Sequence, residues 1–228
     1  MMGALQPGLH HCSPLAGESL DTLTQVIADP YHPPPPGREE RHHGIDFAYY
    51  RRAGRVSIQG QDVQSVLTGT VAAALSGTFP YGNVVIVESA LDLLPAAWVD
   101  RLGAKPGEAL YVLYAHLESA PLLRMGAHVS LCQVVGQVGK TGNAGMAHLH
   151  LETRLGPADS RFPGMRYYVK EATPEEKQAY RLWRTSGVFR HFNPLDLLSP
   201  GDAPPPFPTP GPIHSTSRSS SPEPRTND

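Results

Sequence analysis

The chain has 228 residues, of which 40% are hydrophobic, and its formal net charge is −2. This composition is sufficient for one domain with a sizeable core, and the charge gives no support for nucleic-acid binding. No run approaches the ~18 apolar residues that a transmembrane helix requires. Met1 to Pro14 lack the basic and apolar regions of a signal peptide, so we expect export to need an upstream start or another route.

Residues 1–36 are predicted to form a lead-in to the main domain. Ser19 precedes an amphipathic pattern that continues to Val26 and Ile27, which indicates a short helix with Ser19 as its N-cap. Pro33 to Pro36 follow and predict a stiff, extended segment.

Residues 37–198 are predicted to be a single all-β domain with an antiparallel sheet. Short apolar segments alternate there with glycine turns, whereas few long helical patterns occur as a parallel α/β fold would need. The candidate strands are Ile45–Arg51, Val56–Ile58, Val63–Val66, Gly69–Ala74, Asn83–Glu88, Leu110–Leu117, His128–Leu131, Val134–Val138 and Ala147–Arg154.

Two segments of this domain depart from the strand pattern. Residues 89–109 contain a helix-like apolar piece, with Gly103 as its expected stop. Residues 156–191 contain Thr173-Pro174-Glu175-Glu176, which predicts a capping box with proline at the first helical position. We therefore expect a helix that continues to about Trp183.

The end of the chain, residues 199–228, is rich in Pro, Ser, Thr and Gly and has almost no core-forming residues. Such a segment cannot bury enough apolar surface to offset its ordering entropy, so a disordered tail is predicted. The two cysteines, Cys12 and Cys132, are too few for a disulfide framework. Cys132 lies in a strand-like run, and we expect it to be a small buried hydrophobic residue.

The segment Ala147–Glu152 contains the most informative motif. His148 and His150 are spaced i, i+2 in an alternating apolar run, so both should point from one face of a strand while the leucines point into a core. Two imidazoles side by side on a solvent-facing wall suit metal binding or acid–base chemistry. Glu152 shares that face and either orients one imidazole or is a solvated charge at the strand end.

A second motif, His42 to Asp46, pairs a histidine with a carboxylate in an H-x-x-x-D spacing, and Gly44 would let the backbone turn between them. Imidazole and carboxylate both bind zinc, at roughly 2.0–2.2 Å. With one histidine of the H-x-H pair, three ligands and one open position result, which is the arrangement of catalytic zinc. His116 ends another apolar run and could face the same groove. His43 should point away.

In this order, the motifs resemble those of the lysostaphin/LytM-type zinc metallopeptidases, the murein endopeptidase family. The family pattern contains H-x-x-x-D, a histidine in Y-x-H-L, G-x-x-G-x-T-G leading into H-L-H, Y-G-N before a central strand, and a closing N-P-L. The corresponding segments here are His42–Asp46, Tyr114–Leu117, Gly136–Gly142, His148–His150, Tyr81–Asn83 and Asn193–Leu195. The similarity extends from about Asp29 to Leu198.

The resemblance implies that His42, Asp46 and His150 bind one zinc ion, and that His116 and His148 are catalytic histidines that do not bind it. It implies a zinc endopeptidase that hydrolyses peptide bonds in peptidoglycan cross-links or stem peptides, located outside the cytoplasm in the cell envelope or secreted. Because all five positions are filled, an enzyme is favoured. Two alternatives stay open: a catalytically silent module that binds murein or activates another cell-wall hydrolase, and a zinc peptidase acting on ordinary proteins.

Relative to this family, residues 89–109 and 156–191 are insertions. Insertions beside a groove often shape substrate choice, yet plain surface decoration is an equally open interpretation. A blocking N-terminal segment is another device of the family. Asp21, Asp29 and the Glu39–Glu40 pair of the lead-in could reach the zinc.

Overall fold

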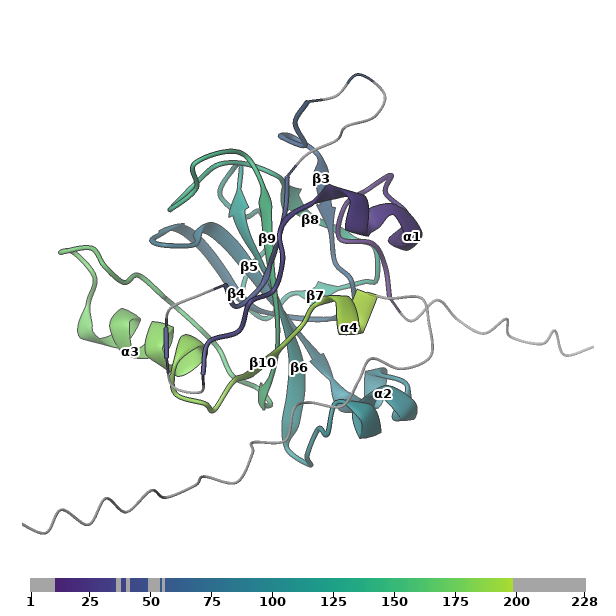
Figure 1. Cartoon of the computed structure of the whole chain (residues 1–228). Coiled ribbons are helices and arrows are strands. Elements are labelled where there is room, and N and C mark those ends of the chain that lie inside the picture. The colour runs from purple at the N-terminus through teal and green to yellow at the C-terminus, as the bar shows by residue number, and fades with distance from the viewer. Residues whose placement is uncertain (1–10, 36–37, 40–41, 49–53, 55, 199–228) are drawn as a thin grey trace, which may run out of the picture.

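The structure is a computed structural model that describes residues 11–35, 38–39, 42–48, 54 and 56–198 (Figure 1). The helices are α1 (Leu20–Leu23), α2 (Ala96–Arg101), α3 (Pro174–Arg184) and α4 (Leu195–Leu198), with 3-10 turns η1 (Thr24–Val26) and η2 (Leu91–Leu93). The strands are β1 (Ile27–Asp29), β2 (Ile45–Phe47), β3 (Asp62–Gln64), β4 (Gly69–Thr78), β5 (Gly82–Ala90), β6 (Glu108–Leu117), β7 (His128–Val129), β8 (Val134–Gln137), β9 (Leu149–Pro157) and β10 (Arg190–Phe192). The predicted tail, 199–228, lies outside the described residues.

An antiparallel sheet organises the fold, in the order β1-β2-β9-β6-β5-β4-β7, and β10 pairs with β9 beyond the end of β2. Strands β3 and β8 form a separate two-stranded sheet. The expected all-β antiparallel architecture is therefore confirmed. None of the helices within the described ranges is long and apolar enough to span a membrane.

The alternation predicted for β9 determines what lies on each face of the sheet. Leu149, Leu151 and Leu155 are buried in the larger apolar cluster, together with residues of β2, β4, β5 and β6. The intervening residues His150, Glu152 and Arg154 point to the opposite face. The candidate site and the larger apolar cluster therefore lie on opposite faces of β9.

The opposite face carries a second apolar cluster, which the insertion 156–191 covers. Phe162, Met165, Tyr180, Trp183 and Phe189 of the insertion are all buried there against the sheet. The predicted capping box is present: Thr173 Oγ1 accepts from the Glu176 backbone N–H at 3.3 Å, and Glu176 Oε2 accepts from the Thr173 N–H at 2.9 Å. This insertion is part of the core rather than a surface decoration.

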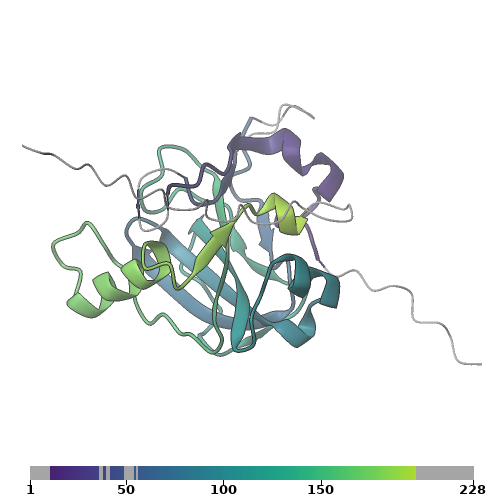
Figure 2. The same cartoon turned by 60° about the horizontal axis from the view of Figure 1, so that its bottom comes forward.

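The other insertion, 89–109, packs at a different place. Its helix α2 lies well apart from α3 in both views (Figures 1 and 2). Leu94 and Leu102 join the larger apolar cluster, and Gly103 follows the helix with a positive φ of 57°, as a helix stop requires.

Several strand predictions were wrong in their bounds or missing. The stretch Val56–Ile58 is irregular, and the described part of the predicted strand 45–51 is extended only over β2. Strands β1 and β10 were not predicted, because each has only three residues and no alternating apolar pattern of its own. Each is a strand because it forms backbone hydrogen bonds with its neighbour, β1 with β2 and β10 with β9.

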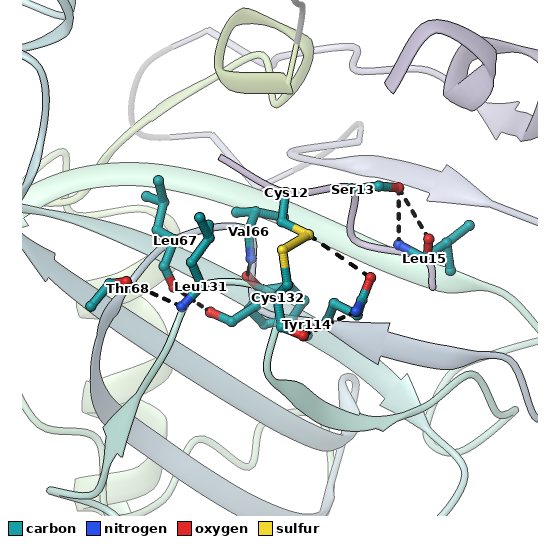
Figure 3. Close-up of a disulfide and its surroundings, with 11 residues drawn as sticks. Cys12, Ser13, Leu15, Val66, Leu67, Thr68, Tyr114, Leu131 and Cys132 are labelled. Atoms are coloured by element: carbon teal, nitrogen blue, oxygen red, sulfur yellow. Dashed lines mark hydrogen bonds between the residues drawn. A yellow bond between two sulfur atoms is a disulfide. The ribbon is translucent and has the colours of Figure 1, made fainter. Parts of the chain in front are cut away.

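The cysteine prediction is corrected by the structure, because Cys12 and Cys132 form a disulfide (Figure 3). Their Cα atoms are 5.5 Å apart although 120 residues separate them in the chain. Both cysteines dock on one stretch: the Cys12 N–H donates to the Val66 carbonyl at 3.1 Å, and the Cys132 N–H donates to the Ser65 carbonyl at 2.9 Å. The disulfide therefore fastens the lead-in to the domain.

Candidate metal centre

Three predicted ligands converge where β2 pairs with β9. Asp46 lies directly opposite His150 in the register of these strands, and His42 precedes β2. His42 Nε2 is 3.0 Å from Asp46 Oδ1 and 3.0 Å from His150 Nδ1, and His150 Nδ1 is 2.8 Å from Asp46 Oδ1. Ligands that each lie ~2.0–2.2 Å from one ion would sit about this close together.

The second nitrogen of each imidazole shows which atom faces the centre. His42 Nδ1 donates to the Pro30 carbonyl at 3.0 Å, and His150 Nε2 donates to Glu152 Oε1 at 3.0 Å. In the neutral rings, His42 Nε2 and His150 Nδ1 therefore carry lone pairs. These two lone pairs and the Asp46 carboxylate would repel one another unless a cation lay between them, so the donor set fits a zinc ion.

The electrostatics of the metal-free cluster agree with this need for positive charge. Burial raises the pKa of Asp46, but its hydrogen bonds with His150 and His42 more than offset burial and hold it well below the usual range. Burial lowers the pKa of His150, but hydrogen bonds with Asp46 and Glu152 raise it overall to about 9. A proton on His150 thus supplies the cation that the cluster otherwise lacks.

The other two predicted site residues lie beside these ligands. The ring centroids of His116 and His148 are 4.5 Å apart, and His148 Nε2 is 3.4 Å from Asp46 Oδ2. His116 Nδ1 donates to the Thr141 carbonyl at 2.8 Å, and His148 Nδ1 donates to the Met146 carbonyl at 2.9 Å. In its neutral form, each ring therefore carries a lone pair on Nε2. The structure brings all five predicted residues together.

His116 is held in an unusual backbone conformation. Its φ is +62°, in the left-handed region that a residue with a Cβ seldom adopts. The His116 N–H donates to the Tyr81 carbonyl at 2.9 Å, and the Thr141 hydroxyl donates to the Leu117 carbonyl at 2.8 Å. Burial, followed by the neighbouring His150 and His148, lowers the pKa of His116 to about 3, so its ring is neutral at pH 7.

Gly44 is required for a different reason from the one expected. The chain does bend at His43–Gly44, but Gly44 has no positive φ. A Cβ at this position would instead clash with the Leu151 carbonyl oxygen of β9. The glycine therefore allows the His42–Asp46 segment to approach β9 closely enough for the ligands to meet.

Glu152 is a buried anchor of His150, not a solvated charge. Its Oε1 accepts hydrogen bonds from His150, from the Tyr81 hydroxyl at 2.8 Å and from Arg184 at 3.2 Å. Its Oε2 accepts from Arg154 at 2.9 and 2.7 Å and from Trp183 Nε1 at 2.9 Å. Burial raises its pKa, but Arg154 and the hydrogen bond with His150 hold the pKa well below its usual range.

His43 points away from the ligands, as predicted, but into the interior rather than toward solvent. It is fully buried, and its Nδ1 accepts from Arg154 Nη2 at 2.9 Å. Its ring lies 4.8 Å from that of His191, whose Nδ1 accepts from the Tyr31 hydroxyl at 2.6 Å. The lead-in residue Tyr31 therefore fixes the ring of His191, which packs against His43.

The described part of the lead-in supports the centre, and none of its residues lines the pocket around the ligands. Asp29 Oδ2 lies 3.5 Å from His42 Nδ1, on the side of the ring opposite the ligand atom. Glu39 accepts from the Tyr180 hydroxyl at 2.6 Å, so its carboxylate is engaged with α3. Asp21 is exposed on α1, and Glu40, the fourth acidic residue proposed to reach the metal, lies outside the described residues.

The five site residues line an open pocket of about 330 Å³. The remaining lining residues are Pro80, Tyr81, Asn143, Gly145 and Arg184. Sequence reasoning missed Arg184, whose only signal is its place near the end of the predicted helix. The pocket thus combines three residues whose donor atoms suit a cation, two further imidazoles and one guanidinium.

Comparison with known proteins gives one family. Similar solved structures include the catalytic domain of the antimicrobial peptidase lysostaphin from Staphylococcus simulans (22% identity, TM-score 0.42, 60% of this chain and 86% of that one). A second is a mutant catalytic domain of the prophage-encoded M23 protein EnpA from Enterococcus faecalis (24% identity, TM-score 0.41, 60% of this chain and 85% of that one). A third is a zinc containing peptidase from Vibrio cholerae (21% identity, TM-score 0.39, 57% of this chain and 33% of that one).

These TM-scores lie below 0.5, so the assignment does not depend on them. No curated protein matches the chain. The model of peptidase family M23, however, matches residues 40–161, which is more than half of the sequence. This match confirms the resemblance read from the motifs, and the chain therefore belongs to peptidase family M23.

Proposed function

We propose that this protein is a zinc-dependent endopeptidase that hydrolyses peptide bonds in peptidoglycan cross-links or stem peptides. The observation that carries the proposal is the convergence of His42 Nε2, Asp46 Oδ1 and His150 Nδ1 within 3.0 Å of one another, beside two further histidines. Membership of a peptidase family and an open pocket around the cluster support it.

His42, Asp46 and His150 would hold the zinc ion. Bound zinc would polarise the scissile carbonyl and lower the pKa of a water ligand from ~15.7 to ~7. His116 and His148 both line the pocket, and in its neutral form each ring carries a lone pair on Nε2. One of these imidazoles would take a proton from the attacking water, and the resulting imidazolium would donate from Nε2 to the tetrahedral oxyanion and then pass that proton to the leaving amine.

We assign the protein to an extracytoplasmic location, in the cell envelope or secreted. The Cys12–Cys132 disulfide supports this assignment, because disulfides form and persist in oxidising compartments. Peptidoglycan, the proposed substrate, lies in the same location.

The decisive experiment incubates purified protein with isolated peptidoglycan, with and without a chelator, beside a His150→Ala variant. Released muropeptides are then analysed, and casein serves as a control substrate. Chelator-sensitive release that the variant lacks would support the proposal, and the products would identify the bond. Cleavage of casein but not peptidoglycan would point to a peptidase for ordinary proteins. No release from either, with zinc bound, would point to a silent module.

A second experiment separates ligands from catalytic histidines. His116→Ala and His148→Ala should abolish turnover yet retain one equivalent of zinc, while His42→Ala should lose the metal. Loss of zinc from either of the first two variants would contradict the proposed division of roles.

A further inference from the structure

Helix α3 belongs to the insertion 156–191, and the helix itself lies beyond the matched family region, residues 40–161. At its C-terminal end, Trp183 and Arg184 both reach Glu152 of β9, 31 and 32 residues away in the chain. Trp183 is fully buried, and the side chain of Arg184 is 14% exposed. Two successive residues of the helix thus contact the carboxylate that holds His150.

The contacts divide between the two oxygens of Glu152. Trp183 Nε1 donates to Oε2 at 2.9 Å, the oxygen that Arg154 also contacts. Arg184 Nη1 donates to Oε1 at 3.2 Å, the oxygen that accepts from His150 Nε2. With a donor from α3 on each oxygen, rotation of the carboxylate about the Cγ–Cδ bond is restrained. The position of Oε1 then determines where the His150 ring can lie.

The same helix also holds the segment that leads to the other histidine ligand. Tyr180 donates to Glu39 Oε1 at 2.6 Å, and Arg184 Nη2 donates to the Glu39 carbonyl at 3.4 Å. Glu39 lies three residues before His42. Helix α3 therefore connects both segments that carry the histidine ligands.

We propose that Trp183 and Arg184 are positioning residues for the zinc site, acting through Glu152 on His150. The inference depends on the proposed function, since it assigns these residues to the proposed zinc centre. Groups that hydrogen-bond to a ligand histidine fix its orientation and raise its basicity, and their loss typically weakens metal affinity by about 10- to 100-fold. Because Trp183 and Arg184 act one step further out, we expect a loss on the order of tenfold.

The test measures zinc affinity by competition with a chromophoric chelator, without any substrate. Arg184→Gln and Trp183→Phe remove the donors to Glu152, and Arg184→Lys retains the charge. Arg181→Gln is the matched control, since it removes an exposed guanidinium of the same helix that contacts Tyr167 instead. Circular dichroism at the assay temperature establishes that each variant is folded.

Weaker zinc binding in folded Arg184→Gln and Trp183→Phe, with partial recovery in Arg184→Lys and wild-type affinity in Arg181→Gln, is the expected result. Wild-type affinity in both of the first two variants would overturn the inference while leaving the proposed function intact. Should Arg184→Gln not fold, the more conservative Trp183→Phe decides. Absence of zinc binding in the wild type would overturn the proposed function itself.

Discussion

Replacement of Glu152 by glutamine probes the buried network behind the metal centre. The change keeps the shape of the side chain but replaces one acceptor oxygen by an NH₂ donor. Each oxygen of Glu152 accepts three hydrogen bonds. Whichever of the two positions the glutamine NH₂ group takes, it therefore points at donors rather than acceptors. Arg154, which is fully buried, also loses its counter-charge.

Breaking a buried ion pair by removing one partner costs about 3–5 kcal/mol, against a total stability of about 5–15 kcal/mol for a typical domain. We expect Glu152→Gln to lower the free energy of unfolding by that amount. Urea unfolding in the presence of a chelator measures it without a contribution from bound metal. Glu171→Gln, at an exposed turn, is the control and should change stability by less than about 0.5 kcal/mol.

The single variant Arg154→Met and the double variant Glu152→Gln/Arg154→Met complete a double-mutant cycle. If the penalty arises from an uncompensated guanidinium, the double variant should lose less than the sum of the two single losses. A Glu152→Gln variant as stable as the Glu171→Gln control would refute the account of a buried, charge-coupled network.

Three further predictions address other parts of the molecule. Burial lowers the pKa of His191 to about 4 from an ordinary value near 6.5, so the stability contributed by its neutral ring is complete above pH 6.5 and is lost as the pH falls to about 4. The free energy of unfolding, measured by urea titration at each pH, should therefore fall by about 2–3 kcal/mol less in His191→Gln than in the wild type between pH 6.5 and 4. An equal dependence of this free energy on pH in the two proteins would contradict the lowered pKa of His191. Reduction of the Cys12–Cys132 disulfide, or Cys132→Ser, should cost about 2–5 kcal/mol, and the two treatments should move the urea midpoint equally. Gly44→Ala should cost about 1–3 kcal/mol in thermal unfolding and weaken zinc binding, since its Cβ would clash with β9; equal affinity would show that the backbone shift is absorbed elsewhere.

The site residues were predictable because their signals are local. Period-2 alternation places His150 and Glu152 of β9, and His148 directly before it, on one side of the chain, and this follows from strand geometry alone. The spacing of His42 and Asp46 likewise keeps both residues in one short segment, with His42 just before β2 and Asp46 within it. The capping box at Thr173 is also a pattern of four successive residues, and it appears where it was expected.

What could not be predicted depends on contacts between distant residues. The Cys12–Cys132 pairing needs knowledge that both residues dock on the stretch around Val66. The short strands β1 and β10 exist because β2 and β9 offer them free edges. Glu152 allowed two interpretations, and only the approach of α3 and Arg154 decides between a solvated and a buried carboxylate.

Both histidine ligands depend on groups outside the region that the family model matches. His42 donates to the carbonyl of Pro30 in the lead-in, and His150 donates to Glu152, which Trp183 and Arg184 hold. A chain reduced to residues 40–161 would retain all five motif residues but lack these partners. In this protein, therefore, the five motif residues indicate the proposed chemistry, while the two flanking segments hold the imidazoles where that chemistry would need them.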